Sequence, residues 1–283
     1  MILAKVEPEY RAIHRIADRL APEMRQAFLR AVKLLRERLD VTRLRELLNR
    51  GDQGELGAFW QAFEQEVGPE LRAPIREAVM QTGERTGRQF GLRFDMTNPR
   101  AITAIDNLAA TLIHDITLES REAIRAVLRA GFNEGVTVPD MARRIRGSVG
   151  LNARSALAVE NFRAAQLDQG IDPEVVDERA DRYAQRLLRQ RATNIARTET
   201  MAASNLGQQA VWQEAQHEGL IGAATRIWIT TPDDRLCEIC EPMDGQVRGL
   251  NEPFITGEGF SVDLPPAHPQ CRCAVGLNVE SPV

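Results

Sequence analysis

The residues best suited to chemistry lie near the carboxy-terminal end of the chain. All four cysteines fall between positions 237 and 273, in the order Cys237-Glu238-Ile239-Cys240, 27 residues, and His268-Pro269-Gln270-Cys271-Arg272-Cys273. Two thiolates of a C-x2-C turn can hold one ion, and a second pair of ligands completes the tetrahedron that zinc prefers. The sequence therefore predicts one zinc site, made from four of Cys237, Cys240, His268, Cys271 and Cys273.

The fourth ligand is left open by the spacing. Cys271 and Cys273 both qualify, and the alternation of side chains along a strand slightly favours Cys273. Four protein ligands leave no position for water or substrate, so the site is expected to be structural. The alternatives are two disulfides or unligated thiols. The chain shows no signal peptide or membrane span, so we expect a soluble protein in a reducing compartment, where spaced cysteines favour metal.

Zinc enzymes with a recognisable signature do not fit this sequence. A nucleobase deaminase pairs H-x-E with P-C-x2-C, but Leu236 precedes Cys237. A HEXXH protease helix is missing, because His217-Glu218-Gly219 ends the match after two residues. We find no phosphate-binding loop, dinucleotide fingerprint or serine-hydrolase elbow. We therefore expect no enzymatic activity; the alternative is a zinc hydrolase using Glu199 or Asp234.

Composition allows a folded protein and names no partner. The 283 residues are 43% hydrophobic and 27% charged, with a net charge of -4, so intrinsic disorder is excluded and a strongly charged partner is not implied. The charge is uneven, since residues 1–50 carry 12 basic and 7 acidic side chains and residues 201–283 carry 4 and 11. A basic start could face DNA phosphates.

The elements that must position the site are mostly helices. From Glu9 to Gly219 the chain is rich in helix formers with apolar residues at three- and four-residue spacing. Prolines 22, 69 and 74 and the glycines near 51–54 and 68 are expected to separate several helices. Expected helices include 25–39, 101–113, 118–130, 153–167 and 173–219, with a cap at Thr97 or Asn98 that marks a domain border.

The chain after Gly219 follows a different pattern. Residues 226–231 predict a strand, and frequent glycine and proline predict a loop-rich module that needs a metal to hold it. We therefore predict a mainly α protein, with an elongated multi-helix region followed by a small zinc-stapled β/loop module. The predicted domains are an amino-terminal helical region, a helical core and the zinc module, over 1–97, 98–218 and 219–283.

A basic helical hairpin offers a second candidate function. A short helix capped at Thr137, a turn at 147–150 and the helix 153–167 resemble a helix-turn-helix in their order, which would bind DNA without strong sequence preference. An ordinary packed helical hairpin is the commoner structure. The candidate DNA contacts are Arg143, Arg144, Arg146 and Arg154.

Glu199 stands in an apolar helical stripe with Ile195, Ala202, Leu206 and Ala210. A carboxylate in such a stripe is either a catalytic group or a half-buried acid paired with an arginine of a neighbouring helix. No histidine, cysteine or second carboxylate stands beside it at catalytic spacing, so the sequence favours the structural interpretation.

These residues together resemble the phage minor head proteins related to the F protein of phage Mu. The resemblance is strongest over residues 190–277 and extends back to about Asn98. It rests on Ile195-Ala196-Arg197-Thr198-Glu199, Asn205, Trp228, the segment 234–240, Asp244-Gly245, Phe254 and the segment 265–273.

The resemblance implies a head-morphogenesis protein of a tailed phage, present in few copies in the virion. It implies a place in the head interior or at the portal vertex, after assembly in the host cytoplasm, and a role in genome packaging or DNA ejection. The implied partners are the portal protein, other head proteins and packaged double-stranded DNA, with no membrane and no small-molecule substrate. The same resemblance assigns the five zinc-type residues and a helical signature of Arg197, Thr198, Glu199 and Asn205.

Overall fold

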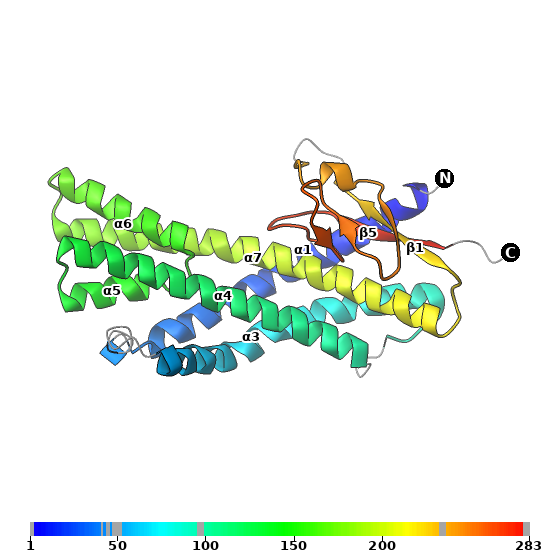
Figure 1. Ribbon diagram of the computed structural model, residues 1–283, viewed down its shortest axis with the longest axis horizontal. Helices are drawn as coiled ribbons and strands as arrows, with labels where there is room; N and C mark the ends of the chain where they lie inside the picture. The colour runs from blue at the N-terminus through cyan, green and yellow to red at the C-terminus, as the bar shows by residue number, and fades with distance from the viewer. Residues whose placement is uncertain are drawn as a thin grey trace. The chain divides into compact units, whose positions relative to one another are not determined.

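The computed structural model describes residues 3–40, 42–43, 46, 53–94, 99–231 and 236–279. It is 71% helical with a small carboxy-terminal sheet, which confirms the predicted mainly α class (Figure 1). None of the helices in these ranges has the length and apolarity needed to span a membrane. The helices are α1 Leu3–Arg38, α3 Gln53–Gly87, α4 Pro99–Glu134, α5 Val138–Ser148, α6 Ala153–Asp168 and α7 Pro173–His217, and the strands are β1 Ala224–Ile229, β2 Val247–Gly249, β3 Phe254–Ile255, β4 Ser261–Val262 and β5 Ala274–Val279.

Helices α1 and α3 are longer than the sequence predicted. Helix α1 continues through Pro22 and α3 through Pro69 and Pro74, so these prolines do not separate helices. An interior proline costs about 3 kcal/mol, but fully buried residues on either side, such as Met24 and Leu71, outweigh that cost.

Helix α4 corrects a second expectation, because it is one helix where two were predicted. The segment 113–118 contains no glycine or proline. The hydroxyl groups of Thr117 and Ser120 donate to the carbonyl oxygens of Ile113 and Ile116 at 2.9 and 2.7 Å. These polar side chains are therefore satisfied inside the helix and do not end it.

The chain forms two compact units, each assembled from separate segments. Unit 1 comprises residues 1–25, 72–109 and 194–283, and unit 2 comprises residues 26–71 and 110–193. The predicted domains divide the sequence linearly, whereas α1, α3, α4 and α7 each contribute to both units. The predicted cap at Thr97 or Asn98 lies outside the described residues, and α4 begins at Pro99.

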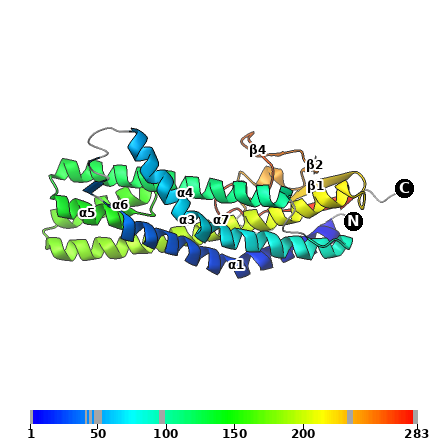
Figure 2. The same cartoon turned by 90° about the horizontal axis from the view of Figure 1, so that it is seen from below.

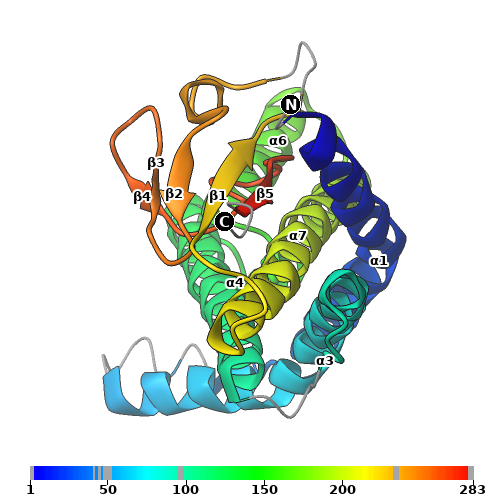
Figure 3. The same ribbon diagram turned by 90° about the vertical axis from the view of Figure 1, so that its right-hand side faces the viewer.

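Unit 1 contains the sheet, whose strand order is β2-β1-β5 with both pairings antiparallel (Figure 3). Every second residue of β1 is buried, so Ala224, Arg226 and Trp228 share the covered face. Trp228 packs with Trp212 of α7 and with Phe254 in one apolar cluster. The two-stranded pair β3-β4 completes the module.

Unit 2 is entirely helical in its described part, with α5 and α6 beside α4 and the first half of α7 (Figure 2). The predicted cap of α5 is confirmed, because the Thr137 hydroxyl oxygen accepts from the Asp140 backbone N–H. Gly150 adopts the left-handed conformation at φ 83°. A Cβ there would lie 2.6 Å from a methyl group of Val32, so only glycine fits this turn.

Candidate metal centre

Two tight turns of unit 1 supply the candidate ligands. In the first, the backbone N–H groups of Cys240 and Glu241 donate to the Cys237 carbonyl oxygen at 3.0 and 2.9 Å. In the second, the Cys271 N–H donates to the His268 carbonyl oxygen at 3.0 Å, and Gln270 has φ 63°. Proline at the second position and a positive φ at the third define a type II turn. Each turn brings two ligands to the same side of the backbone.

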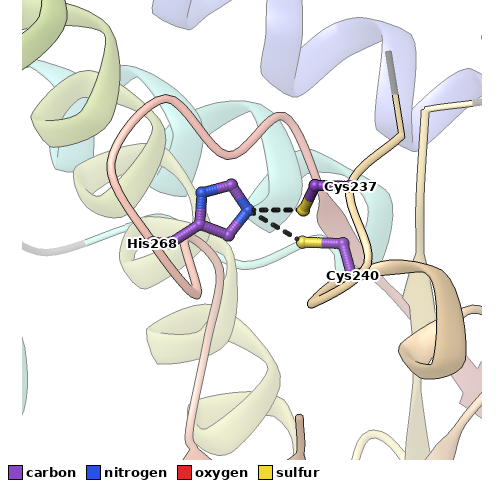
Figure 4. Close-up of side chains that lie close together, drawn as sticks. All are labelled: Cys237, Cys240 and His268. Carbon is purple, nitrogen blue, oxygen red and sulfur yellow. Dashed lines mark hydrogen bonds between the residues drawn. The ribbon is translucent and has the colours of Figure 1, made fainter. Parts of the chain in front are cut away.

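The ligand atoms of Cys237, Cys240 and His268 form a compact group. The Nε2 atom of His268 lies 3.1 Å from the sulfur of Cys237 and 3.1 Å from the sulfur of Cys240 (Figure 4). The sulfurs of Cys240, Cys271 and Cys273 form a second group, and in both groups the ligand atoms lie within 4.8 Å of one another. Cys240 belongs to both, so the structure brings all five predicted ligands together.

The protonation of His268 suits a metal ligand. Its Nδ1 atom lies 2.9 Å from the Pro269 carbonyl oxygen. A carbonyl oxygen accepts, so Nδ1 donates this hydrogen bond, and Nε2 is the ring nitrogen available to a metal. That atom faces the two sulfurs. An orienting hydrogen bond on the other ring nitrogen is the usual support of a metal-bound histidine.

The thiols of the second group differ in pKa. Hydrogen bonds from Cys240 and Cys273 lower the pKa of the Cys271 thiol to about 2. The hydrogen bond with Cys271 raises the pKa of Cys240 far above its ordinary value. The backbone N–H of Cys273 also donates to the Cys271 sulfur, at 3.5 Å. Negative charge therefore settles most readily on Cys271.

The donor set fits a zinc ion. All four cysteines are free thiols, so the disulfide alternative finds no support in the structure. A tetrahedral zinc with 2.3 Å zinc–sulfur bonds has a sulfur–sulfur edge of about 3.8 Å, and the sulfurs of Cys240 and Cys271 are 3.7 Å apart. Three of the thiols are buried, where a thiolate needs a cation beside it.

Side chains of helix α7 hydrogen-bond to the backbone around the site. The Thr198 hydroxyl accepts from the backbone N–H of Gln270 at 2.9 Å, and the Asn205 side-chain oxygen accepts from that of Val275 at 3.4 Å. Gln208 and Gln209 donate to the carbonyl oxygens of Val275 and Leu250 at 2.9 and 2.6 Å. Two residues of the predicted helical signature thus bind the module's backbone, one of them at the turn that carries two ligands.

The other two signature residues have different positions. Arg197 is exposed and lines a cavity of about 470 Å³ beside Gln270 and Arg272. Glu199 is half-buried, in agreement with its place in the apolar stripe; the predicted pairing with an arginine stays a prediction. Asp234, the other acid of the hydrolase alternative, lies outside the described residues.

Arg226 is a residue that sequence reasoning missed. It is 2% exposed and donates to the carbonyl oxygens of Gly249, the last residue of β2, and of Glu252 and Asp263, which follow β2 and β4. Its guanidinium also stacks over Phe254 at 5.0 Å. Its position two residues before Trp228, on the same face of a strand, was the signal that could have revealed it.

The predicted DNA-binding arginines lie in unit 2 and are not equivalent. Arg143 pairs with Asp140 and Asp177, and Arg144 pairs with Glu134 and Glu160 at 2.7 and 2.9 Å. The Arg144 side chain is 8% exposed, so it serves the packing of the hairpin. Arg146 and Arg154 are exposed. Arg143 and Arg144 therefore fit the packed-hairpin interpretation, whereas Arg146 and Arg154 are not engaged in it.

Comparisons with known proteins place the chain in a family. No curated protein and no solved structure matches it. Residues 122–276, more than half of the chain, match the family described as phage Mu protein F like protein. The matched segment contains α5, α6, α7 and nearly all of the module with its candidate metal ligands. The chain therefore belongs to the phage Mu protein F like family, which points to a protein of phage head morphogenesis.

Proposed function

We propose that the chain is a structural, non-enzymatic minor protein of a tailed-phage head, associated with the portal vertex and acting in head assembly and genome packaging or delivery. The observation that carries the proposal is the family match over the metal module and its supporting helix. The portal protein and other head proteins are its partners, in the host cytoplasm during assembly and in the virion afterwards.

The metal in this proposal is zinc, held by Cys237, Cys240, His268 and Cys271. The 3.7 Å edge between Cys240 and Cys271 and the N–H of Cys273 aimed at the Cys271 sulfur support this choice over Cys273. When bound, zinc crosslinks the two turns that carry its ligands. Four protein ligands leave no site for a substrate, which supports a role in binding and not in hydrolysis.

Cobalt substitution tests the ligand set. In the purified chain, Cys271→Ser is expected to lose the absorption of a three-sulfur cobalt site, whereas Cys273→Ser keeps it at unchanged wavelength. If Cys273→Ser removes the band and Cys271→Ser retains it, Cys273 is the fourth ligand. If the unaltered chain binds neither cobalt nor zinc, the metal proposal is wrong.

Co-expression with the portal protein of the same phage tests the function. The unaltered chain is expected to co-purify with portal rings, and Cys240→Ser to lose this association because the module no longer folds around its metal. Arg125→Gln, on an exposed position of α4, is the control and should bind as the unaltered chain does. Absence of the chain from portal complexes and from purified particles would overturn the proposal.

A further inference from the structure

A groove between α6 and α7 in unit 2 is lined mainly by basic and aromatic side chains. Its volume is about 860 Å³. None of the eight lining residues is acidic, and four are arginines from one helix. They are Ala158, Asn161 and Phe162 of α6 and Arg179, Arg182, Tyr183, Arg186 and Arg189 of α7.

The positive charge of the groove is largely uncompensated. Arg179 donates to the neutral side chain of Gln166 at 2.7 Å, and Arg182 pairs with exposed Glu178. An exposed pair of this kind contributes little and is easily exchanged. The guanidinium groups of Arg186 and Arg189 have no hydrogen-bond or ion-pair partner within the described ranges. These cations are therefore free to bind an external anion.

The spacing of the arginines matches a polyphosphate strand. Positions 179, 182, 186 and 189 follow the three- and four-residue spacing of one helix face. The ten steps along the helix from Arg179 to Arg189 rise about 15 Å. Duplex DNA carries about one negative charge per 1.7 Å of its axis when both strands are counted, so several phosphates lie within that length. The row of guanidinium groups therefore meets negative charge along its whole length.

The aromatic residues of the groove are already engaged with one another. Tyr183 has the Phe162 ring at 5.2 Å in an edge-on arrangement and the Arg186 guanidinium over its own ring at 4.9 Å. A single strand bound by stacking would need a free ring face. The rings instead hold Arg186 in position, which favours binding through the backbone of a duplex.

Helix α6 adds a fifth cation at one end. The contacts Gln166–Arg179 and Phe162–Tyr183 show that the two helices run antiparallel. Arg154 lies one helical turn before Ala158 and is therefore level with about residue 191, just past Arg189. It is exposed. One of the four arginines predicted to contact DNA thus extends the groove, together with arginines outside the predicted hairpin.

We propose that this arginine groove, Arg179, Arg182, Arg186 and Arg189 with Arg154 at its end, binds the phosphate backbone of double-stranded DNA without sequence preference. The proposed binding site depends only on the positions and charges of these arginines, whereas its use on a packaged genome rests on the proposed function. A chain that failed to bind DNA could still enter particles, so the two proposals fail separately.

The test is the salt dependence of binding to a labelled 30-base-pair duplex of mixed sequence, measured by anisotropy with the full chain. Five phosphate contacts predict that affinity falls about 500-fold between 50 and 200 mM salt, and the three contacts left in the double variant predict about 40-fold. Arg186→Gln/Arg189→Gln is expected to show the smaller dependence and weaker binding at 50 mM. Circular dichroism checks that the variant is folded.

The matched control is Arg125→Gln/Arg129→Gln. It removes the same charge from two exposed positions of α4 in the same unit, outside the groove, and should bind as the unaltered chain does. Equal losses in both variants would reduce the effect to net charge and overturn the proposal. Three other results would also overturn it: no duplex binding, tighter binding of a 30-nucleotide single strand, or groove-dependent binding of polyglutamate or anionic vesicles.

Discussion

The two compact units of this chain supplement apolar burial with different chemistry. In unit 1 the sheet module is short and loop-rich, and thiols and an imidazole converge at its centre. In unit 2 the helices α5, α6 and α7 meet around buried charges, with Glu160 at 3% and Arg163 at 2% exposure. Neither unit relies on apolar burial alone.

The difference follows from backbone regularity. Helices satisfy their own backbone groups, so unit 2 can use long side chains from adjacent helices to pair across the core. The module of unit 1 has strands of two to six residues and few ladder bonds. A region of this kind gains little from burial relative to its chain entropy, and a metal bound by the Cys/His cluster would supply the remainder. If the two units are separately stabilised, a change in one unit should leave the other folded.

Removal of the metal should have the largest effect and should affect unit 1. Structural zinc contributes on the order of 10 to 16 kcal/mol in small finger domains, so excess chelator is expected to unfold the module. Amide exchange of β1 and β5 should become fast, while that of α5 and α6 stays slow. Retained protection of β1 under chelation would contradict the assignment of a structural metal.

Removal of one partner from a buried ion pair should have the next largest effect and should affect unit 2. Arg144→Met leaves buried Glu160 with Arg163, whose guanidinium is 3.8 Å away. Breaking such a pair costs about 3 to 5 kcal/mol. Denaturant unfolding followed through α6 amide exchange should show this loss, with zinc affinity unchanged.

The double variant Arg144→Met/Glu160→Met is its control and should recover most of the lost stability. The pH dependence gives a second check. Burial raises the pKa of Glu160 in the folded protein, so the folded state binds more protons, and stability falls as pH rises from about 4.5 through the raised pKa. Arg144→Met should enlarge this fall, and the double variant should abolish it. A defect independent of pH would contradict the ion-pair account.

A close backbone contact predicts a smaller loss in unit 1. A Cβ at Gly207 of α7 would lie 2.4 Å from the Val79 carbonyl oxygen of α3. Backbone atoms cannot rotate away, so Gly207→Ala should cost about 3 kcal/mol. Gly57 in α3 has nothing within 4 Å of the same position, and Gly57→Ala should stabilise by about 0.5 to 1 kcal/mol. Thermal melts of both variants show whether steric room for a Cβ or helix propensity determines the change in stability at each glycine.

The sequence allowed most of the secondary structure to be predicted, because capping and apolar spacing are local. Thr137 capped α5 as expected, and α6 and α7 began where Ala153 and Pro173 indicated. The continuity of α1 and α3 could not be predicted. Whether Pro22 or Pro74 ends a helix depends on how deeply its neighbours, such as Met24, Leu71 and Ile75, are buried, and the local sequence does not show that burial.

The ligands of the site were predictable and their supports were not. Cysteine and histidine spacing is a sequence property, whereas the bonds of Gln208 and Gln209 to the module join residues 67 and 41 positions apart. The same limit applies to Arg143 and Arg144, because their acidic partners include Asp177, 34 residues from Arg143. Charge in a sequence does not show whether an arginine is free or paired.

The smallest effect is expected at Gln270, in the turn that joins two ligands. Its φ of 63° costs a residue with a Cβ about 1 to 2 kcal/mol, while glycine loses about 0.5 to 1 kcal/mol more entropy on folding. Gln270→Gly should therefore stabilise unit 1 by about 0.5 kcal/mol, and Gln270→Ala should leave it unchanged. The bond to Thr198 uses the backbone N–H and survives both changes. Melts at fixed zinc concentration measure the difference. If Gln270→Gly destabilised the module, contacts of the Gln270 side chain would have to contribute more stability than its positive φ costs.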